Sequence, residues 1–168
     1  MNIAAAAAAA ALCTAIGFIK AASDEDAKMS VKALCTDIRN MNTQIDFKSD
    51  TVDIIFGKIK KTSQLSEVWD IMQSETESGK SCEAAWQKAS VENASLFEPY
   101  TDDEKAELCS FFCSLGKTNR EAEKQKLMFI CAVLEKAAER TDAETEKSKK
   151  LWKSLGALIG TGLAILII

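Results

Sequence analysis

Residues 154–168 read SLGALIGTGLAILII and carry no charged side chain, and residues 3–19, IAAAAAAAALCTAIGFI, are uncharged as well. As helices, the first stretch would be about 23 Å long and the second about 25 Å, against a bilayer hydrocarbon core of roughly 30 Å. Leu151 and Trp152 can extend the C-terminal stretch, with the Lys153 side chain reaching toward the interface. We therefore expect a transmembrane helix at each end, over residues 1–19 and 151–168.

Lysines border both apolar stretches on the side that faces the middle of the chain. Lys20, Lys28 and Lys32 follow the first stretch, and residues 147–153 contain further lysines before the second. Because Lys and Arg accumulate on the cytoplasmic side of membrane segments, residues 20–150 are predicted to form a cytoplasmic domain. The alternative is a secretory signal cleaved near Ala22, which would send the cysteines that follow it into an oxidising compartment where disulfides form.

Composition limits the chemistry that the middle of the chain can perform. The net charge of −4 gives no basic field for nucleic acid, and histidine, the commonest general base and metal ligand, is absent. The six cysteines show no C-x-x-C spacing, so they are expected to act as small apolar residues rather than as zinc ligands. No catalytic residue, cofactor site or metal site is predicted.

One proline and seven glycines in 168 residues favour helices throughout. Apolar stripes and capping residues predict six helices. The first covers 28–47, a short one follows Asp50, and the third runs from Ser63 to just before Gly79. The others begin at Ser81, at Thr101, where Glu104 completes a capping box, and at Thr118, from which the last helix continues into the C-terminal apolar stretch. The aromatic residues of these stripes are interpreted as packing residues; they are Trp69, Trp86, Phe111, Phe112 and Phe129. The run EKAAERTDAETEKSKK (135–150) is interpreted as a solvated helix face with i,i+4 ion pairs. The predicted fold is all-α, a membrane-anchored helical bundle with an N-terminal and a C-terminal transmembrane helix.

A partial phosphate-loop motif lies in SLGKTNREAEKQ (114–125), where Gly116, Lys117 and Thr118 match its last three positions. The first glycine of the motif is replaced by Phe111, and the preceding residues have a helical period rather than a strand pattern. We therefore predict a turn between helices, with Gly116 after the end of one helix and Thr118 with Glu121 as the capping box of the next. Nucleotide binding through Lys117 is the alternative.

Small residues recur every four positions in the C-terminal apolar stretch. Gly156 and Gly160 form a G-x-x-x-G pattern that Ala164 extends. Such a stripe allows helix backbones to approach closely in a membrane. It predicts a packing face of the C-terminal helix, against the first apolar stretch or against a partner helix.

Four segments together resemble a known family. They are LCTDIRNMNTQIDF (34–47), GKSCEAAWQKA (79–89), LGKTNREAEKQKL (115–127) and KLWKSLGALIGTGLAILII (150–168). In this order, and with an apolar N-terminus ending in Gly17 and Phe18, the chain resembles the stage III sporulation protein AB family over nearly its whole length.

The resemblance implies a non-enzymatic membrane platform in a channel-like, secretion-like complex between mother cell and forespore. It implies a location in the mother-cell membrane around the forespore, with a central cytoplasmic domain similar to the F-domain of type II secretion platform proteins. The implied partners are a secretion-type ATPase, the other membrane components of the complex and membrane lipid. The polar corner with Lys117, Arg120, Glu121 and Glu123 is our predicted partner-binding surface.

Overall fold

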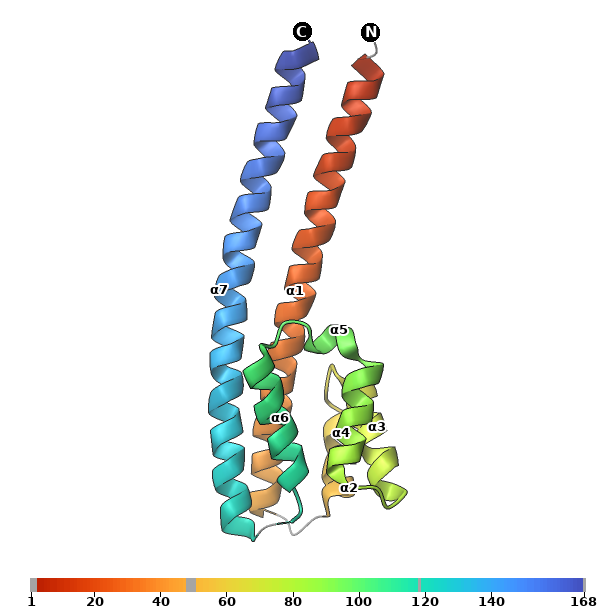
Figure 1. The fold of residues 1–168 in the computed structure, drawn as a ribbon, viewed down its shortest axis with the longest axis vertical. Helices are drawn as coiled ribbons and strands as arrows, with labels where there is room; N and C mark the ends of the chain where they lie inside the picture. The colour runs from red at the N-terminus through yellow and green to blue at the C-terminus, as the bar shows by residue number, and fades with distance from the viewer. Residues whose placement is uncertain (1–2, 48–50, 118, 168) are drawn as a thin grey trace. The chain divides into compact units, whose positions relative to one another are not determined.

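The computed structural model describes residues 3–47, 51–117 and 119–167, and within these ranges every regular element is a helix (Figure 1). In chain order they are α1 (Ile3–Phe47), α2 (Val52–Lys60), α3 (Ser66–Glu77), α4 (Cys82–Glu92), α5 (Ala94–Phe97), α6 (Asp102–Ser114) and α7 (Arg120–Ile167). The predicted all-α class is confirmed.

The chain divides into two compact units. One unit comprises Met29–Glu139, and the other combines Met1–Lys28 with Arg140–Ile168. The predicted division at residues 19 and 150 followed the expected membrane boundaries and stays a prediction. Within the part of the chain that the structure describes, none of the helices combines the length and the apolarity needed to cross a membrane.

The sequence predicts most helix boundaries well, because their signals are local. Ser81 caps α4 by accepting a hydrogen bond from the backbone N–H of Ala84 at 3.2 Å. The predicted capping box of α6 is present: Thr101 Oγ1 accepts from the Glu104 N–H at 3.2 Å, and a Glu104 carboxylate oxygen accepts from the Thr101 N–H at 2.8 Å. Also as predicted, α7 continues without a break through the C-terminal apolar stretch.

Several elements differ from the prediction. Helix α1 runs unbroken from Ile3 to Phe47, although a transmembrane helix over 1–19 and a separate helix over 28–47 were predicted, and α7 begins at Arg120 rather than at Thr118. Helix α3 begins at Ser66 rather than near Ser63, because the Ser63 hydroxyl accepts from the Leu65 N–H at 2.8 Å and holds a turn before the helix. Helix α5 is not predicted at all, since four residues are too few to show a helical period.

The core of the Met29–Glu139 unit is built on the predicted apolar stripes. A series of aromatic contacts joins its short helices: the Trp69 ring lies 5.6 Å from Phe56 and 6.4 Å from Phe112. Phe112 stacks on Trp86 at 4.2 Å, and Trp86 meets Phe97 edge to face at 5.1 Å. These rings link α2, α3, α6, α4 and α5 into one core, so the packing roles predicted for Trp69, Trp86, Phe111 and Phe112 are confirmed.

The packing role predicted for Phe129 is wrong, because 56% of this residue is exposed. The buried positions of α7 are Leu127, Ile130 and Leu134, which recur at helical spacing. Phe129 is two positions from Leu127, a rotation of about 200° around a helix with 3.6 residues per turn, so it points away from the core.

A carboxylate lies inside this core without a cation among the partners that the structure describes. Asp37, on α1, is 3% exposed, and its Oδ2 accepts from the indole N–H of Trp69 at 2.7 Å and from the Ser63 hydroxyl at 2.5 Å. Burial raises the pKa of the Asp37 carboxyl above its usual range, although the two hydrogen bonds act in the opposite direction. Asp37 therefore ties α1 to α3 through a polar contact in an otherwise apolar core.

Replacing Asp37 by Asn should change how stability depends on pH. Because the folded-state pKa is raised, the carboxyl's contribution to stability is full below its unfolded-state pKa of about 3.9 and is lost as the pH rises through the folded-state pKa. The stability of Asp37→Asn relative to the wild type should therefore rise with pH above about 4. Urea unfolding followed by tryptophan fluorescence, at several pH values, measures this difference.

The matched variant Asp37→Ala should destabilise the protein throughout this range. It leaves the buried indole N–H of Trp69 without its acceptor, which costs about 1–3 kcal/mol. A pH-independent difference between Asp37→Asn and the wild type would contradict the burial argument.

Candidate functional site

The corner between α6 and α7 has the geometry predicted for a turn between helices. Gly116 has φ of +78°, in the left-handed region that follows many helix ends, and the Lys117 N–H donates to the Ser114 carbonyl at 3.2 Å. Leu115 is buried beneath the turn. The element before Gly116 is helix α6, whereas a phosphate loop follows a strand, so the turn interpretation of this motif is confirmed.

A different residue from the one predicted caps α7. The Oδ1 atom of Asn119 accepts from the Ala122 N–H at 2.9 Å, which is the bond expected of an N-cap side chain. The predicted cap, Thr118, lies outside the described residues. The Glu123 carboxylate accepts from the Gly116 N–H at 2.8 Å and so connects the first turn of α7 back to the glycine.

The corner presents some of the predicted partner-binding residues to solvent. The Lys117 side chain is 58% exposed, with its Nζ 4.0 Å from a carboxylate oxygen of Glu83 on α4. Glu121 is exposed, while Glu123 is partly buried and holds the turn. The Arg120 side chain lies outside those that the structure describes. Lys117 and Glu121 are therefore the described side chains here that a partner can reach, and Glu123 supports them.

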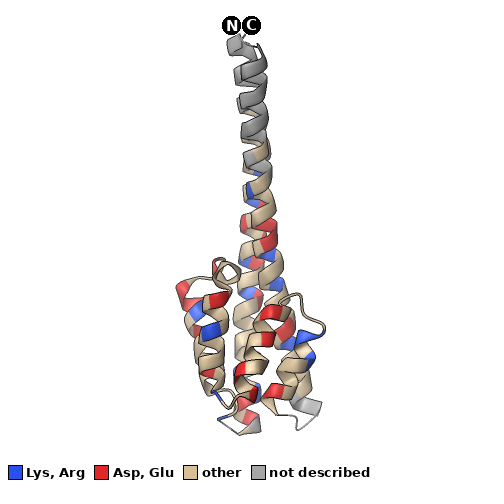
Figure 2. Ribbon diagram, turned by 90° about the vertical axis from the view of Figure 1, so that its right-hand side faces the viewer, with Lys and Arg blue, Asp and Glu red and all other residues tan. Residues whose placement is uncertain are grey.

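In the unit of Met1–Lys28 and Arg140–Ile168, α1 and α7 run antiparallel and pair through charged and hydroxyl side chains. Lys28 forms an ion pair with Asp142 at 2.7 Å, and Lys149 pairs with Glu25. Asp24 receives hydrogen bonds from two α7 hydroxyls: Thr145 to its carbonyl at 3.2 Å and Ser148 to its carboxylate at 2.5 Å. We call these contacts the charged ladder. Figure 2 shows acidic and basic residues together on this part of the paired helices.

The ladder corrects the interpretation of residues 135–150 as a solvated face. One predicted i,i+4 pair is present, Arg140 with Glu144 at 3.2 Å, but Thr141 and Thr145 are 5% and 3% exposed. The run therefore has a second face that packs on α1. A hydrogen bond from Lys149 lowers the pKa of Glu25, and a hydrogen bond to Asp142 raises the pKa of Lys28. Glu25 and Lys28 therefore both stay charged near neutral pH.

Comparison with known protein families gives a match over nearly the whole chain. The model of the family described as stage III sporulation protein AB matches residues 2–168. The chain belongs to the stage III sporulation protein AB family. No curated protein matches the chain. No solved structure matches it either.

Membership of the stage III sporulation protein AB family confirms the resemblance carried by segments 34–47, 79–89, 115–127 and 150–168. It gives the chain a role in stage III of sporulation. The α6–α7 corner and the charged ladder both lie within the residues that match the family model.

The thiols that the structure describes form neither a disulfide nor a metal-binding group. The five cysteines that the structure describes are free, and Cys109 and Cys113 lie 4.0 Å apart on α6. Burial, with hydrogen bonds to Glu83 and Cys109, raises the pKa of the Cys113 thiol to about 11, so it is protonated at neutral pH. Among the described residues, no group of three Cys, Asp or Glu side chains could hold a metal ion.

The predicted small-residue face of the C-terminal helix stays a prediction. Gly156 and Gly160 are in α7, but they lie among the residues whose side-chain surroundings the structure does not describe.

Replacing Gly116 by Ala should destabilise the corner through backbone strain alone. A Cβ at this position would lie 3.6 Å from the Val52 side chain, an ordinary contact, while φ of +78° costs an L-residue about 1–2 kcal/mol. Gly79→Ala is the matched control, since its φ is +83° and nothing lies within 4 Å of the added Cβ. Urea unfolding of both variants should give losses of similar size; a stable Gly116→Ala variant would contradict the left-handed geometry.

Proposed function

We infer that this chain is a non-enzymatic membrane platform of a stage III sporulation complex between mother cell and forespore. Its apolar ends anchor it in the mother-cell membrane around the forespore. Its Met29–Glu139 unit lies in the cytoplasm and docks a secretion-type ATPase, and the remaining membrane components of the complex surround the anchors. The observation that carries this proposal is the charged ladder, together with the family match over residues 2–168.

The ladder supports paired anchoring for a physical reason. The two uncharged stretches leave it from the same end, because α1 continues from Lys20 toward its N-terminus and α7 continues from Lys149 toward its C-terminus. Five charged side chains and two hydroxyls fix the register of the antiparallel helices before these stretches begin. Two apolar helices held side by side would enter a bilayer together, and their lysines would remain at its cytoplasmic surface.

The non-enzymatic role is supported by the nature of the polar groups. The buried carboxylate of Asp37 accepts hydrogen bonds from Trp69 and Ser63 and serves the core, and the buried Glu75 pairs with Lys80 and Lys88 beside the Gly79 turn. Both acids are thus occupied by structural partners rather than presented in a cleft. The ATPase would supply hydrolysis, and this chain would position it.

Membrane anchoring predicts both extraction behaviour and topology. Alkaline carbonate should leave the full-length chain in the membrane fraction. A thiol introduced by Val91→Cys, at a residue that is 76% exposed, should react with a membrane-impermeant maleimide only after cells are permeabilised. The unmodified chain provides the background labelling. Release by alkali, or labelling of the introduced thiol in intact cells, would argue against the proposed anchoring and orientation.

The α6–α7 corner is the proposed ATPase contact. It is polar, Lys117 is exposed on it, and Arg is the charged residue that interfaces favour. Affinity purification of the full-length chain from sporulating cells should retain the ATPase, and Arg120→Glu should reduce that retention about tenfold or more, as expected for an interface anchor.

A matched control separates a contact from a general charge effect. Lys136→Glu reverses a charge on the same helix, at another exposed position, and should leave retention unchanged. Circular dichroism should show equal helicity for both variants. If the unmodified chain retains no ATPase, the platform proposal fails; if Arg120→Glu alone has no effect, the contact lies elsewhere.

A further inference from the structure

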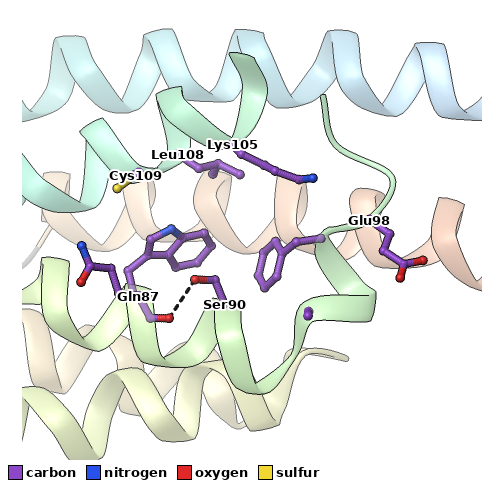
Figure 3. Close-up of a pocket in the computed structure, with 9 residues that line it drawn as sticks. Gln87, Ser90, Glu98, Lys105, Leu108 and Cys109 are labelled. Atoms are coloured by element: carbon purple, nitrogen blue, oxygen red, sulfur yellow. Dashed lines mark hydrogen bonds between the residues drawn. The ribbon is translucent and has the colours of Figure 1, made fainter. Parts of the chain in front are cut away.

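An apolar pocket opens between α4, α5 and α6 in the Met29–Glu139 unit. Its volume is about 430 Å³, and Trp86, Phe97 and Leu108 form its apolar lining. The lining is rigid, because Trp86 is stacked on Phe112 and held edge to face against Phe97. Figure 3 shows Glu98 and Lys105 toward one end of the pocket and Gln87 and Cys109 toward the other. Since a cavity of about 150 Å³ holds benzene, this pocket can accept an aromatic side chain.

The same unit exposes an apolar pair on another helix. Met128 and Phe129 of α7 are 59% and 56% exposed, and they are adjacent in sequence. None of the nine residues that line the pocket comes from α7, and the buried positions of α7, Leu127 and Ile130, face the core. The exposed pair therefore points away from its own core and is free to enter the pocket of a second molecule.

The net charges around the two features are of opposite sign. Glu98 and Lys105 both line the pocket, and the adjoining start of α6 adds the exposed acids Asp102, which pairs with Lys105, and Asp103, so acids outnumber the lysine. The apolar pair is preceded on α7 by Lys124 and Lys126, about one helical turn away. Charges arranged in this way favour the approach of the α7 surface to the pocket rim and disfavour pairing of two α7 surfaces.

We propose that copies of this chain associate head to tail, with Phe129 of one copy inserted into the Trp86–Phe97–Leu108 pocket of the next. Aromatic side chains that enter preformed pockets are the strongest anchors of protein interfaces. Because the two surfaces differ, each copy keeps one free pocket and one free Phe129, so association continues into a ring or an open chain. This inference does not depend on the ATPase contact, which lies at the α6–α7 corner.

Two variants of the full-length chain, each lacking one surface, test the proposal in detergent solution. Phe129→Glu removes the inserted side chain, and Ala94→Trp fills the pocket from the residue that begins α5. Each variant alone should associate at least about tenfold more weakly than the wild type in analytical ultracentrifugation. An equimolar mixture should form a one-to-one dimer and nothing larger, since only one complementary pair of surfaces remains. Ile54→Glu, at a residue that is 45% exposed on α2, is the matched control and should associate like the wild type.

A charge exchange gives a second readout that keeps both apolar surfaces. Glu98→Lys should weaken association, and Lys126→Glu in the same chain should restore it. The proposal is overturned if the wild type stays a single copy at all concentrations, because the pocket then serves another partner. It is also overturned if Ala94→Trp associates normally while Phe129→Glu does not, since that result means that two α7 surfaces pair face to face. Failure of the mixture to form a dimer, with both variants of normal helicity, overturns it as well.

Discussion

The Met29–Glu139 unit depends on the contacts that the Trp69 side chain makes. Its ring packs between Phe56 of α2 and Phe112 of α6, and its N–H bonds the buried carboxylate of Asp37 on α1. One residue thus joins four helices through two kinds of force, apolar burial and a hydrogen bond inside a low-dielectric core. Short helices such as α2 and α3 are marginal in isolation, so this shared core is what keeps them folded.

The unit of Met1–Lys28 and Arg140–Ile168 is held together by a different balance of forces. Among the described residues, ion pairs and hydroxyl hydrogen bonds join α1 to α7; the ion pairs are partly exposed and Thr145 is buried. Individual exposed ion pairs contribute little, but several in register specify one alignment of two helices and oppose sliding. The acidic residues Asp24 and Glu25 therefore have a structural use as partners of Ser148 and Lys149 on α7.

The surfaces and the interior have separate roles in this chain. The buried carboxylate of Asp37 serves packing, and burial raises the pKa of the Cys113 thiol. The chain presents to other molecules a polar helical corner, an apolar pocket with Glu98 and Lys105 at one end, and an exposed aromatic residue, Phe129.

The sequence alone determined the helical class, most helix boundaries and the turn at Gly116. Each depends on interactions within a few residues, such as the Ser81 cap and the Thr101–Glu104 capping box, so local patterns report them directly. The family could also be read from short segments, because motifs keep their order along the chain.

Only the tertiary structure decided which polar and aromatic residues are buried. Asp37 lies in the core because Trp69 and Ser63, far from it in sequence, supply its hydrogen bonds, and Phe129 lies outside because the phase of α7 is set by the core it meets. The ladder likewise joins Asp24 to Thr145 and Ser148, more than a hundred residues away. The helical period predicts which residues share one face of a helix. Only packing between distant segments determines which residues that face contacts.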